Sequence, residues 1–307
     1  MTEKPTVGFI GVGLMGHGMA ANILKGGYPL YIKGNSNREP IDDLVSKGAV
    51  EITSPKEMAA LCDVIHLCLP NSDSVEAVIR GDDGILAGGK AGLIVVDSST
   101  ANPTSTVILA EELEAAGMHM VDAPLGRTPK EAEAGMLDAM VGADDAIFAK
   151  VLPIIDCWAG IINHVGPVGS AHKMKLIMNF ISMGYAALYA EALSIGVKSG
   201  VTPQVINDVI GASRLSNGFF ETFMGCAVGR DMDIHKFSIT NASKDVHYAS
   251  AMASSTRTLN PVGEAVKSYY TYVEANGHGA DYVPHLADHV AKMNGFDLAE
   301  AVRKGAK

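Results

Sequence analysis

The sequence contains few cysteines, and its basic residues are outnumbered by acidic ones. It therefore lacks the composition of disulfide-rich, nucleic-acid-binding or membrane-surface proteins. Only four of its 307 residues are cysteine, and none forms a Cys-x-x-Cys spacing, so we expect reduced thiols. Lys and Arg number 24 against 34 Asp and Glu. The resulting net charge of −10 argues against nucleic acid or an anionic membrane surface as the main partner.

Long apolar runs and targeting signals are also missing. We find no apolar stretch that approaches the roughly 20 residues needed to cross a bilayer. Residues 1–5 lack the basic and apolar regions of a signal peptide. We therefore expect a cytoplasmic protein with no membrane partner. A hydrophobic content of 48% and 33 glycines instead predict an α/β chain with an ample core and many tight turns.

A glycine-rich motif follows the first apolar segment. Residues 6–10 are typical of a buried strand, and residues 19–25 are typical of a helix. Between them a GxGxxG motif is typical of dinucleotide binding, because its glycines permit a tight turn and close approach of a pyrophosphate. The helix N terminus adds N–H groups that attract phosphate. The predicted cofactor contacts are Gly11, Gly13, Leu14, Met15 and Gly16.

The loop after the second predicted strand, residues 30–33, bears on the choice between NAD and NADP. An NAD site usually has Asp or Glu about 20 residues after the glycines, for the ribose 2′-hydroxyl. Here Gly34 follows the strand, and Asn35, Ser36 and Arg38 could receive a 2′-phosphate instead. We predict NAD(P) as the cofactor, with a weak tilt towards NADP. A solvated turn is the alternative reading of this loop.

Three later strands, at residues 64–69, 93–96 and 118–121, end in polar or proline-containing loops. In a parallel sheet, ligands lie beyond the carboxyl ends of the strands. We therefore expect these loops to surround the cofactor and the reacting end of the substrate. They contain Leu69, Pro70 and Asn71, then Ser98, Ser99 and Thr100, then residues 122–128.

The chain divides into two predicted domains at Gly166-Pro167. Residues 1–166 form a doubly wound α/β Rossmann domain, completed by strands at 136–141 and 161–165. Residues 167–307 show no strand-like alternation, so we expect an all-helical substrate and oligomerisation domain. Its phenylalanine and tyrosine clusters indicate a surface buried against another subunit. We expect a homodimer or homotetramer.

A long helix, residues 169–200, opens the second domain. Its apolar residues recur every three or four positions and predict a buried face; they are Met174, Met178, Ile181, Tyr185, Leu188, Ala192 and Ile195. Lys175, Asn179 and Ser182 project together from another face. A lysine and an amide aimed the same way are candidate catalytic groups. The alternative is a lysine that extends to water.

Several potential metal ligands occur near the C terminus. Asp281, His285, Asp288 and His289 have a spacing that could hold a metal. An HExxH motif is absent, and a solvated helix face explains these residues equally well. We expect no metal site.

Four segments together resemble the β-hydroxyacid dehydrogenase family, which includes 3-hydroxyisobutyrate dehydrogenase and reductases of tartronate semialdehyde, glyoxylate or succinic semialdehyde, and sulfolactaldehyde. They are residues 8–22, Asp122 to Leu125 with Gly135, residues 169–179, and Lys244-Asp245. The resemblance implies an NAD(P)-dependent oxidoreductase that interconverts a small anionic aldehyde and its hydroxy acid by hydride transfer.

The resemblance also implies roles for individual residues. Lys175 would donate a proton to the carbonyl oxygen during reduction and accept it in the reverse direction. Asn179 would fix the substrate or the lysine. Lys244 would lie near both the nicotinamide and the substrate carboxylate. Ser99 would bind the acidic group of the substrate, and Thr100 would lie near the nicotinamide.

Two departures from the family pattern point to different substrates. Gly126-Arg127-Thr128 resembles the sulfolactaldehyde reductase branch, in which Arg127 and Thr128 would help to hold a sulfonate. The segment Lys173 to Asn179, with Met178 before the asparagine, resembles the glyoxylate/succinic semialdehyde reductase branch instead. Two rival functions are an imine reductase, in which an acid or tyrosine would replace Lys175, and a non-catalytic nucleotide-binding homologue, in which loss of that lysine is expected.

Overall fold

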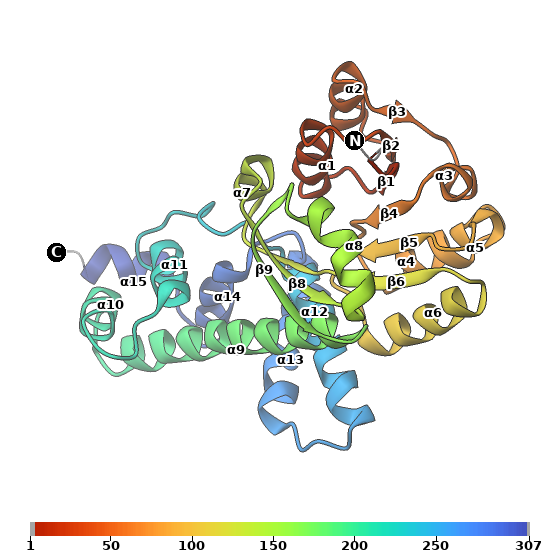
Figure 1. Ribbon diagram of the computed structural model, residues 1–307. Coiled ribbons are helices and arrows are strands. Elements are labelled where there is room, and N and C mark those ends of the chain that lie inside the picture. The colour runs from red at the N-terminus through yellow and green to blue at the C-terminus, as the bar shows by residue number, and fades with distance from the viewer. Residues whose placement is uncertain (1–3, 306–307) are drawn as a thin grey trace. The chain divides into compact units, whose positions relative to one another are not determined.

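The computed structural model describes residues 4–305 (Figure 1). The chain forms two compact units, of which the first ends at Lys175 and the second begins at Leu176. This division falls inside one long helix, on the C-terminal side of the predicted boundary at Gly166. The units are described separately below.

A mixed sheet forms the centre of the first unit. Its strands are β1 (Val7–Ile10), β2 (Leu30–Lys33), β3 (Val50–Glu51), β4 (Val64–Leu67), β5 (Ile94–Asp97), β6 (His119–Asp122), β7 (Leu125–Gly126), β8 (Leu137–Gly142) and β9 (Ala159–Gly166). The order is β3-β2-β1-β4-β5-β6-β8-β7, and β9 pairs with β8. From β3 to β6 all neighbours are parallel, as in a doubly wound α/β fold.

Helices cover both faces of this sheet. They are α1 (Gly16–Lys25), α2 (Glu39–Ser46), α3 (Pro55–Leu61), α4 (Ser72–Arg80), α5 (Ile85–Gly88), α6 (Pro103–Ala115), α7 (Pro129–Ala134) and α8 (Asp145–Ile155). One core joins α1, α2 and α8 to the face that carries Val7 and Phe9, and the other joins α3, α4, α5 and α6 to the face that carries Ile65 and Leu67. Both faces are buried, which explains the continuous apolar strands in the sequence.

Two helices of this unit begin at side-chain caps. Ser54 accepts a hydrogen bond from the Glu57 N–H at 3.2 Å and begins α3. Asn102 accepts one from the Thr104 N–H at 3.1 Å and begins α6. All four cysteines are free thiols, as expected.

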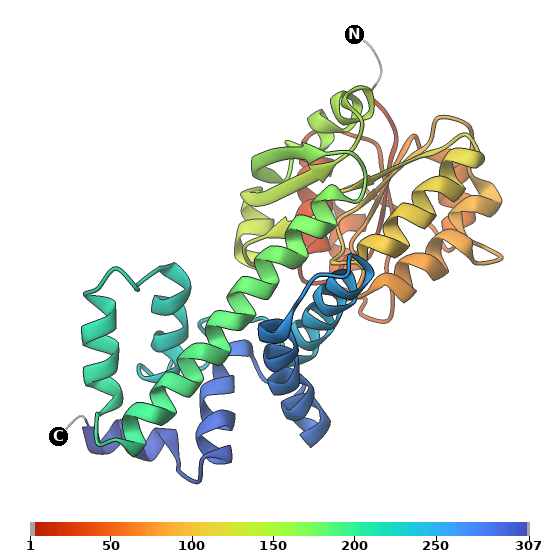
Figure 2. The same ribbon diagram turned by 90° about the horizontal axis from the view of Figure 1, so that it is seen from below.

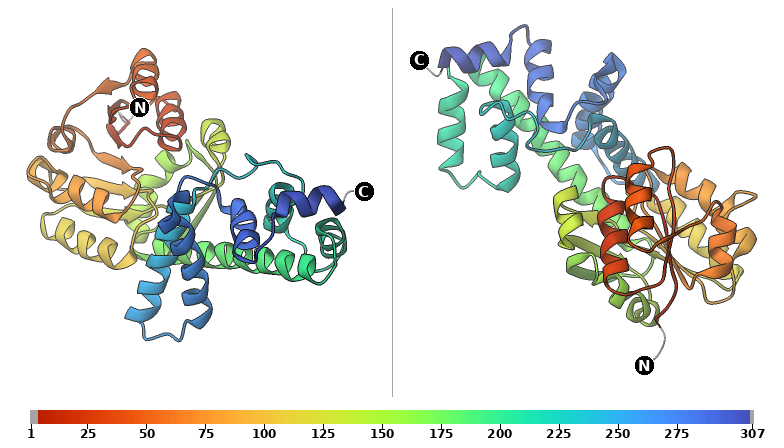
Figure 3. Two further views of the ribbon diagram at one scale, coloured as in Figure 1. Left: turned by 180° about the vertical axis from the view of Figure 1, so that it is seen from behind. Right: turned by 90° about the horizontal axis from the view of Figure 1, so that it is seen from above.

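The second unit is helical, with a single isolated β-bridge between Ser238 and Tyr282 among the described residues. It contains most of α9 (Ser170–Lys198), then α10 (Pro203–Gly211), α11 (Gly218–Ala227), α12 (Ile239–Ser255), α13 (Pro261–Val273), a π-helical turn (Glu274–His278), a 3-10 turn (Val283–His285), α14 (Leu286–Met293) and α15 (Leu298–Gly305). Helices α12 and α13 pack side by side (Figure 3).

Helix α9 is continuous over its 29 residues (Figure 2). The prediction of its buried face is wrong. Met174, Met178, Ile181, Tyr185, Leu188 and Ile195 are all exposed, whereas Met183, Ala186, Ala190 and Leu193 are buried. The small alanines let α9 pack closely against aromatic residues such as Phe223 and Tyr270, which share its core. The helix has two apolar faces, and the structure covers the one with the smaller side chains.

Helix α9 is also long and apolar enough, by length and composition alone, to cross a membrane. The expectation that no segment passes this test is therefore wrong. The same test is met by core helices of soluble proteins, and α9 contributes one face to the hydrophobic core of the second unit.

Candidate active site

The predicted cofactor loops of the first unit meet at the carboxyl edge of the sheet. The strand order changes direction between β1 and β4, which is where dinucleotides bind in doubly wound sheets. The glycine loop follows β1, and Leu69, Pro70 and Asn71 follow β4. The Cys68 N–H donates to the Ile10 carbonyl at 3.0 Å, so the two loops begin side by side.

The glycines of the first loop have two roles. Two of them are required by close backbone packing, and the third leaves open space next to the loop. Gly11 has a φ of +100°, and a Cβ there would lie 2.2 Å from the Cys68 carbonyl oxygen. A Cβ on Gly16 would lie 2.0 Å from the Gly11 carbonyl oxygen. At Gly13, by contrast, a Cβ would meet no described atom within 4 Å. No side chain caps the N terminus of α1 at Met15, and the neighbouring Leu14 is 83% exposed. This loop fits a pyrophosphate.

The loop after β2 is exposed and acidic groups already hold its arginine. Arg38 donates to Glu51 through Nη1 at 2.7 Å and Nη2 at 3.0 Å, and to Asp42 at 2.8 Å. These hydrogen bonds raise the pKa of the Arg38 guanidinium above its ordinary value. A Cβ on Gly34 would lie 2.1 Å from Cδ1 of the buried Ile41. An acidic side chain at Gly34 would therefore require the buried Ile41 of α2 to move. Asn35 and Ser36 are exposed.

Ser99 joins the ends of β4 and β5. Its hydroxyl accepts a hydrogen bond from the Leu69 N–H at 2.9 Å, and its own N–H donates to Asp97 at 2.9 Å. The serine is 3% exposed. Thr100 is half-buried, Pro70 is exposed, and the Asn71 side chain caps α4 by accepting from the Ser74 N–H at 2.9 Å. The predicted loops thus form one connected edge.

The first turn of α9 is fixed to the same edge by Asp122 at the end of β6. One carboxylate oxygen accepts from the Gly169 N–H at 2.7 Å, and the other accepts from the His172 N–H at 2.8 Å. The aspartate is fully buried, and this burial raises its pKa, although the nearby His172 and the backbone hydrogen bonds oppose the rise. A carboxylate at a helix N terminus is stabilised by the helix dipole.

His172 makes the second attachment. Its Nδ1 lies 2.7 Å from the Thr106 hydroxyl, and its Nε2 lies 3.0 Å from the Ser99 carbonyl oxygen. The ring is fully buried. Lys175 follows one turn later on α9 and is half-buried. The backbone that carries this lysine is therefore held on the strand ends by two buried polar side chains.

Arg127 and Thr128 follow β7, which is the last strand in the sheet order that begins with β3. Arg127 is a non-glycine residue with a φ of 79°, and its Nε donates to Asp138 at 2.9 Å. This hydrogen bond raises the pKa of the guanidinium and fixes its direction. The hydroxyl and the N–H of Thr128, the N-cap of α7, both donate to Glu131 in the first turn of this helix. Both predicted substrate residues are exposed.

In the second unit, Asp245 on α12 links two predicted site residues. Its Oδ2 accepts from the Asn179 amide at 2.6 Å, and its Oδ1 lies 3.0 Å from the Lys244 ammonium. The aspartate is 1% exposed, and the Lys244 side chain is 18% exposed. The Lys244 ammonium also lies 5.3 Å from the centre of the Tyr248 ring. Ser182, in contrast, bonds back to carbonyls of its own helix.

Comparison with known proteins agrees with this geometry. Residues 6–166 match the family described as the NAD binding domain of 6-phosphogluconate dehydrogenase. Residues 169–287 match the family described as the NAD-binding domain of NADP-dependent 3-hydroxyisobutyrate dehydrogenase. The chain belongs to the β-hydroxyacid dehydrogenase family. As a member it is an oxidoreductase that uses NAD(P), and the doubly wound fold and helical second unit are those expected from the sequence.

Relatives of this β-hydroxyacid dehydrogenase support the assignment along most of the chain. It is 38% identical to 2-(hydroxymethyl)glutarate dehydrogenase from Eubacterium barkeri over 69% of this chain and 70% of the relative. It is 31% identical to 3-sulfolactaldehyde reductase from Escherichia coli over 89% and 91% of the two chains. Among solved structures, 3-hydroxyisobutyrate dehydrogenase from Mycobacterium tuberculosis, determined with L-serine, has a TM-score of 0.84 at 25% identity, covering 94% and 99% of the two chains.

Three residues that support the candidate site had no assigned role in the sequence reading. Asp122 and Asp245 lie inside the motifs that carry the family resemblance, and His172 precedes Lys175 by one turn. Only Asp122 has a clear local signal, because it directly ends an apolar strand, whereas Asp245 and His172 lie among other polar residues. Of the potential metal ligands, Asp281 and His289 lie together, whereas His285 pairs with the Met232 carbonyl and Asp288 pairs with Arg230.

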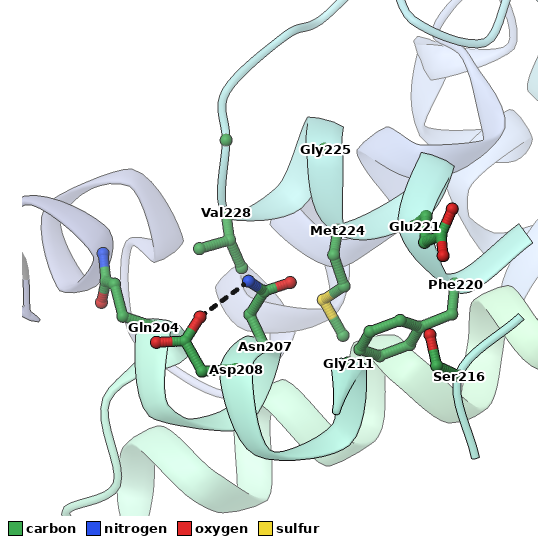
Figure 4. A pocket seen from close by; sticks show the side chains of 11 residues that line it. Gln204, Asn207, Asp208, Gly211, Ser216, Phe220, Glu221, Met224, Gly225 and Val228 are labelled. Carbon is green, nitrogen blue, oxygen red and sulfur yellow. Dashed lines mark hydrogen bonds between the residues drawn. The ribbon is translucent and has the colours of Figure 1, made fainter. Parts of the chain in front are cut away.

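A further pocket in the second unit contains none of the predicted site residues. Gln204, Asn207 and Asp208 of α10 line one side, and Phe220, Glu221 and Met224 of α11 line the other (Figure 4). The Asn207 amide donates to the neighbouring Asp208 at 3.2 Å. The pocket therefore belongs to the packing of α10 on α11 rather than to the candidate active site.

Proposed function

We propose that this β-hydroxyacid dehydrogenase interconverts a small anionic semialdehyde and its hydroxy acid, with Lys175 as the proton donor and acceptor. The observation that carries the proposal is the anchoring of α9. Asp122 and His172 fix its first turn to the strand ends from which the cofactor loops also emerge. A lysine one turn later is held by a rigid support, as proton transfer requires.

The proposed mechanism assigns each protein group one task. Bound NAD(P)H supplies the hydride. The Lys175 ammonium donates a proton to the carbonyl oxygen, so that no free alkoxide forms. Asn179 and Lys244 bind the substrate, and Asp245 fixes the amide of the first and the ammonium of the second. In the oxidative direction, neutral Lys175 accepts the hydroxyl proton.

For the substrate, we propose a three- or four-carbon chain that carries a carboxylate or sulfonate. Arg127 supports this choice, because a guanidinium can hold either oxyanion through paired hydrogen bonds. Asp138 binds Nε and thereby orients the rest of the group. In this proposal Ser99 and Thr128 also contact the substrate, and Thr100 contacts the cofactor. The named relatives act on anionic compounds, namely 2-(hydroxymethyl)glutarate and 3-sulfolactaldehyde.

The rival functions differ in what they require of Lys175. An imine reductase would carry an acid or tyrosine at this position. A non-catalytic homologue would not need a lysine there, nor the two buried side chains that fix its helix. We propose a test with NADH and NADPH against succinic semialdehyde, tartronate semialdehyde, sulfolactaldehyde and a cyclic imine. The proposal expects turnover of at least one anionic aldehyde.

The decisive comparison uses Lys175→Met with Lys173→Met as the matched control on the same helix, where Lys173 is exposed. Lys175→Met should lower kcat about 10²- to 10⁴-fold, the range typical of a lost general acid, while cofactor affinity is kept. Lys173→Met should keep full activity. Turnover of the imine alone, or an active Lys175→Met variant, would refute the proposal.

We further propose that the exposed stripe of α9 is a homodimer interface. Ile181, Leu188 and Ile195 lie on one stripe of α9, and Leu188 and Ile195 are 60% and 66% exposed. A monomer rarely leaves such a continuous apolar surface in water. Light scattering should show a dimer or tetramer for the wild type and for Leu259→Glu, a change at another exposed leucine. Leu188→Glu should give smaller species.

A further inference from the structure

We propose that His278, Asp281 and His289 in the second unit bind one divalent transition-metal ion, with Zn²⁺ as the best fit. Each residue offers one ligand atom, and these atoms all lie within 4.8 Å of one another. The set differs from the one that the sequence suggested, since His285 and Asp288 have other partners and His278 takes their place. Within residues 4–305 this is the one group of three such ligands.

The distances between the ligand atoms are close to those of a tetrahedral site. Zinc bonds of 2.0–2.1 Å to nitrogen and oxygen place neighbouring ligand atoms about 3.3 Å apart. Here Nδ1 of His278 lies 3.4 Å from Oδ2 of Asp281. Nε2 of His289 lies 2.8 Å from the same oxygen, as a hydrogen bond. An ion would therefore need a small opening of this pair, and the two histidine ligand atoms, which lie within 4.8 Å of each other, would adjust to the same spacing.

The backbone around these ligands is fixed by its own hydrogen bonds. Gly277 adopts a φ of 86° at the end of the π-helical turn, which changes the chain direction just before His278. The Asp281 N–H donates to the His278 carbonyl at 3.1 Å, and the Asp281 carbonyl accepts from the Ile239 N–H at 2.7 Å. The loop is thus tied to the start of α12 and presents two ligands from a rigid support.

His289 comes from α14, so an ion would join this helix to the loop that precedes it. The imidazole centres of His278 and His289 are 4.5 Å apart and tilted by 48°, so the two rings lie next to each other. The side chain of His289 is 15% exposed, whereas those of His278 and Asp281 are 44% and 37% exposed. The ion would accordingly keep access to water for a fourth ligand.

The donor set decides the class of ion. Two imidazoles and one carboxylate favour Zn²⁺, Co²⁺ or Ni²⁺, whereas Mg²⁺ and Ca²⁺ prefer oxygen ligands throughout. The carboxylate also supplies one negative charge to the cation. Without an ion, Asp281 and His289 form an ordinary hydrogen bond, and the experiment must separate these two cases.

The test uses the full chain without a histidine tag, after removal of metals by a chelator. Zn²⁺ is titrated calorimetrically, and Co²⁺ is titrated while its visible absorption is recorded. The proposal expects one ion per chain and a tetrahedral Co²⁺ spectrum. His278→Gln, Asp281→Asn and His289→Gln should each weaken binding by at least about tenfold, as loss of a metal partner does.

His285→Gln is the matched control, because this histidine begins α14 but pairs with the Met232 carbonyl. It should bind as tightly as the wild type. Zn²⁺ should raise the Tm of the wild type and of His285→Gln but not that of His278→Gln. Because the His278 side chain is exposed, we expect His278→Gln to fold normally, so unfolding would not explain a loss of binding. Absence of binding to the wild type, or equal binding by all four variants, would overturn the proposal.

Discussion

The imidazole of His172 donates through Nε2 to the carbonyl oxygen of Ser99, at 3.0 Å. A carbonyl oxygen only accepts, so this nitrogen carries the proton. The bond joins the helix that bears Lys175 to the loop that follows β5. Both residues are buried, so water cannot replace the bond if it is lost. The position of the proposed proton donor thus depends on a residue that need not touch the substrate.

Replacement of His172 by Phe should therefore reduce both stability and activity. The change leaves the Ser99 carbonyl and the Thr106 hydroxyl without this partner, and each such loss costs about 1–3 kcal/mol in the free energy of unfolding. We expect kcat to fall while KM changes less, because the lysine is displaced rather than removed. Urea unfolding and steady-state kinetics measure the two effects. Thr106→Val, which removes one of the two bonds, should show a smaller loss of both.

Replacement of Arg127 by Gly should weaken substrate binding without lowering the stability of the protein. The left-handed backbone of Arg127, with a φ of 79°, costs about 1 kcal/mol or more for a side-chain-bearing residue and nothing for glycine. The ion pair with Asp138 is solvent-exposed and contributes little. Arg127→Gly should therefore leave the free energy of unfolding within about 1 kcal/mol of the wild-type value.

The same variant should raise KM for the anionic substrate at least about tenfold, because a charged hydrogen bond to the substrate is lost. Asp138→Asn tests the orienting role and should raise KM by a smaller factor. An unchanged KM in Arg127→Gly would remove Arg127 from the substrate site.

Cofactor preference should respond to the pairing of Arg38 with Glu51. The two hydrogen bonds to Glu51 compete with any 2′-phosphate for the guanidinium. Glu51→Gln weakens that competition and should lower KM for NADPH several-fold, with little effect on KM for NADH. Arg38→Ala should act in the opposite direction. Initial rates at varied cofactor concentration decide the point, and identical KM ratios in both variants would exclude Arg38 from the ribose site.

Much of the first unit could be predicted from local sequence. Strand β2 occurs where the sequence indicates it, and Ser54 and Asn102, each followed by proline, begin helices, because apolar runs and capping side chains act over a few residues. The local signal for helix α2 is weaker. The residues before α2 suggest a turn, and this short helix, Glu39–Ser46, buries only Ile41 and Leu44.

The interactions between distant residues could not be predicted in this way. Arg38 meets Glu51 only because β3 pairs with β2, and His172 meets Ser99 only after the sheet has formed. The periodicity of α9 is ambiguous for a different reason. Its two apolar faces have the same spacing, so the pattern alone does not decide which face packs inside.

His66 should make the protein sensitive to acid. The ring lies on β4 with no exposed surface, stacked on Phe9 at 5.8 Å and edge-on to Trp158 at 6.3 Å. Neither ring nitrogen has a hydrogen-bond partner among the described residues. Burial lowers the pKa of His66 to about 3. In the unfolded chain a histidine has a pKa of about 6.5, so between these values the unfolded chain binds the extra proton.

Stability is therefore fully present above pH 6.5 and falls as the pH decreases towards 3, by roughly 1.4 kcal/mol for each pH unit from this residue alone. Urea unfolding at pH 7 and pH 5 should show that His66→Leu loses about 2 kcal/mol less than the wild type over this interval. His119→Gln, at a partly exposed histidine on β6, should lose as much as the wild type. Equal losses in His66→Leu and the wild type would mean that the buried ring accepts a proton in the folded protein.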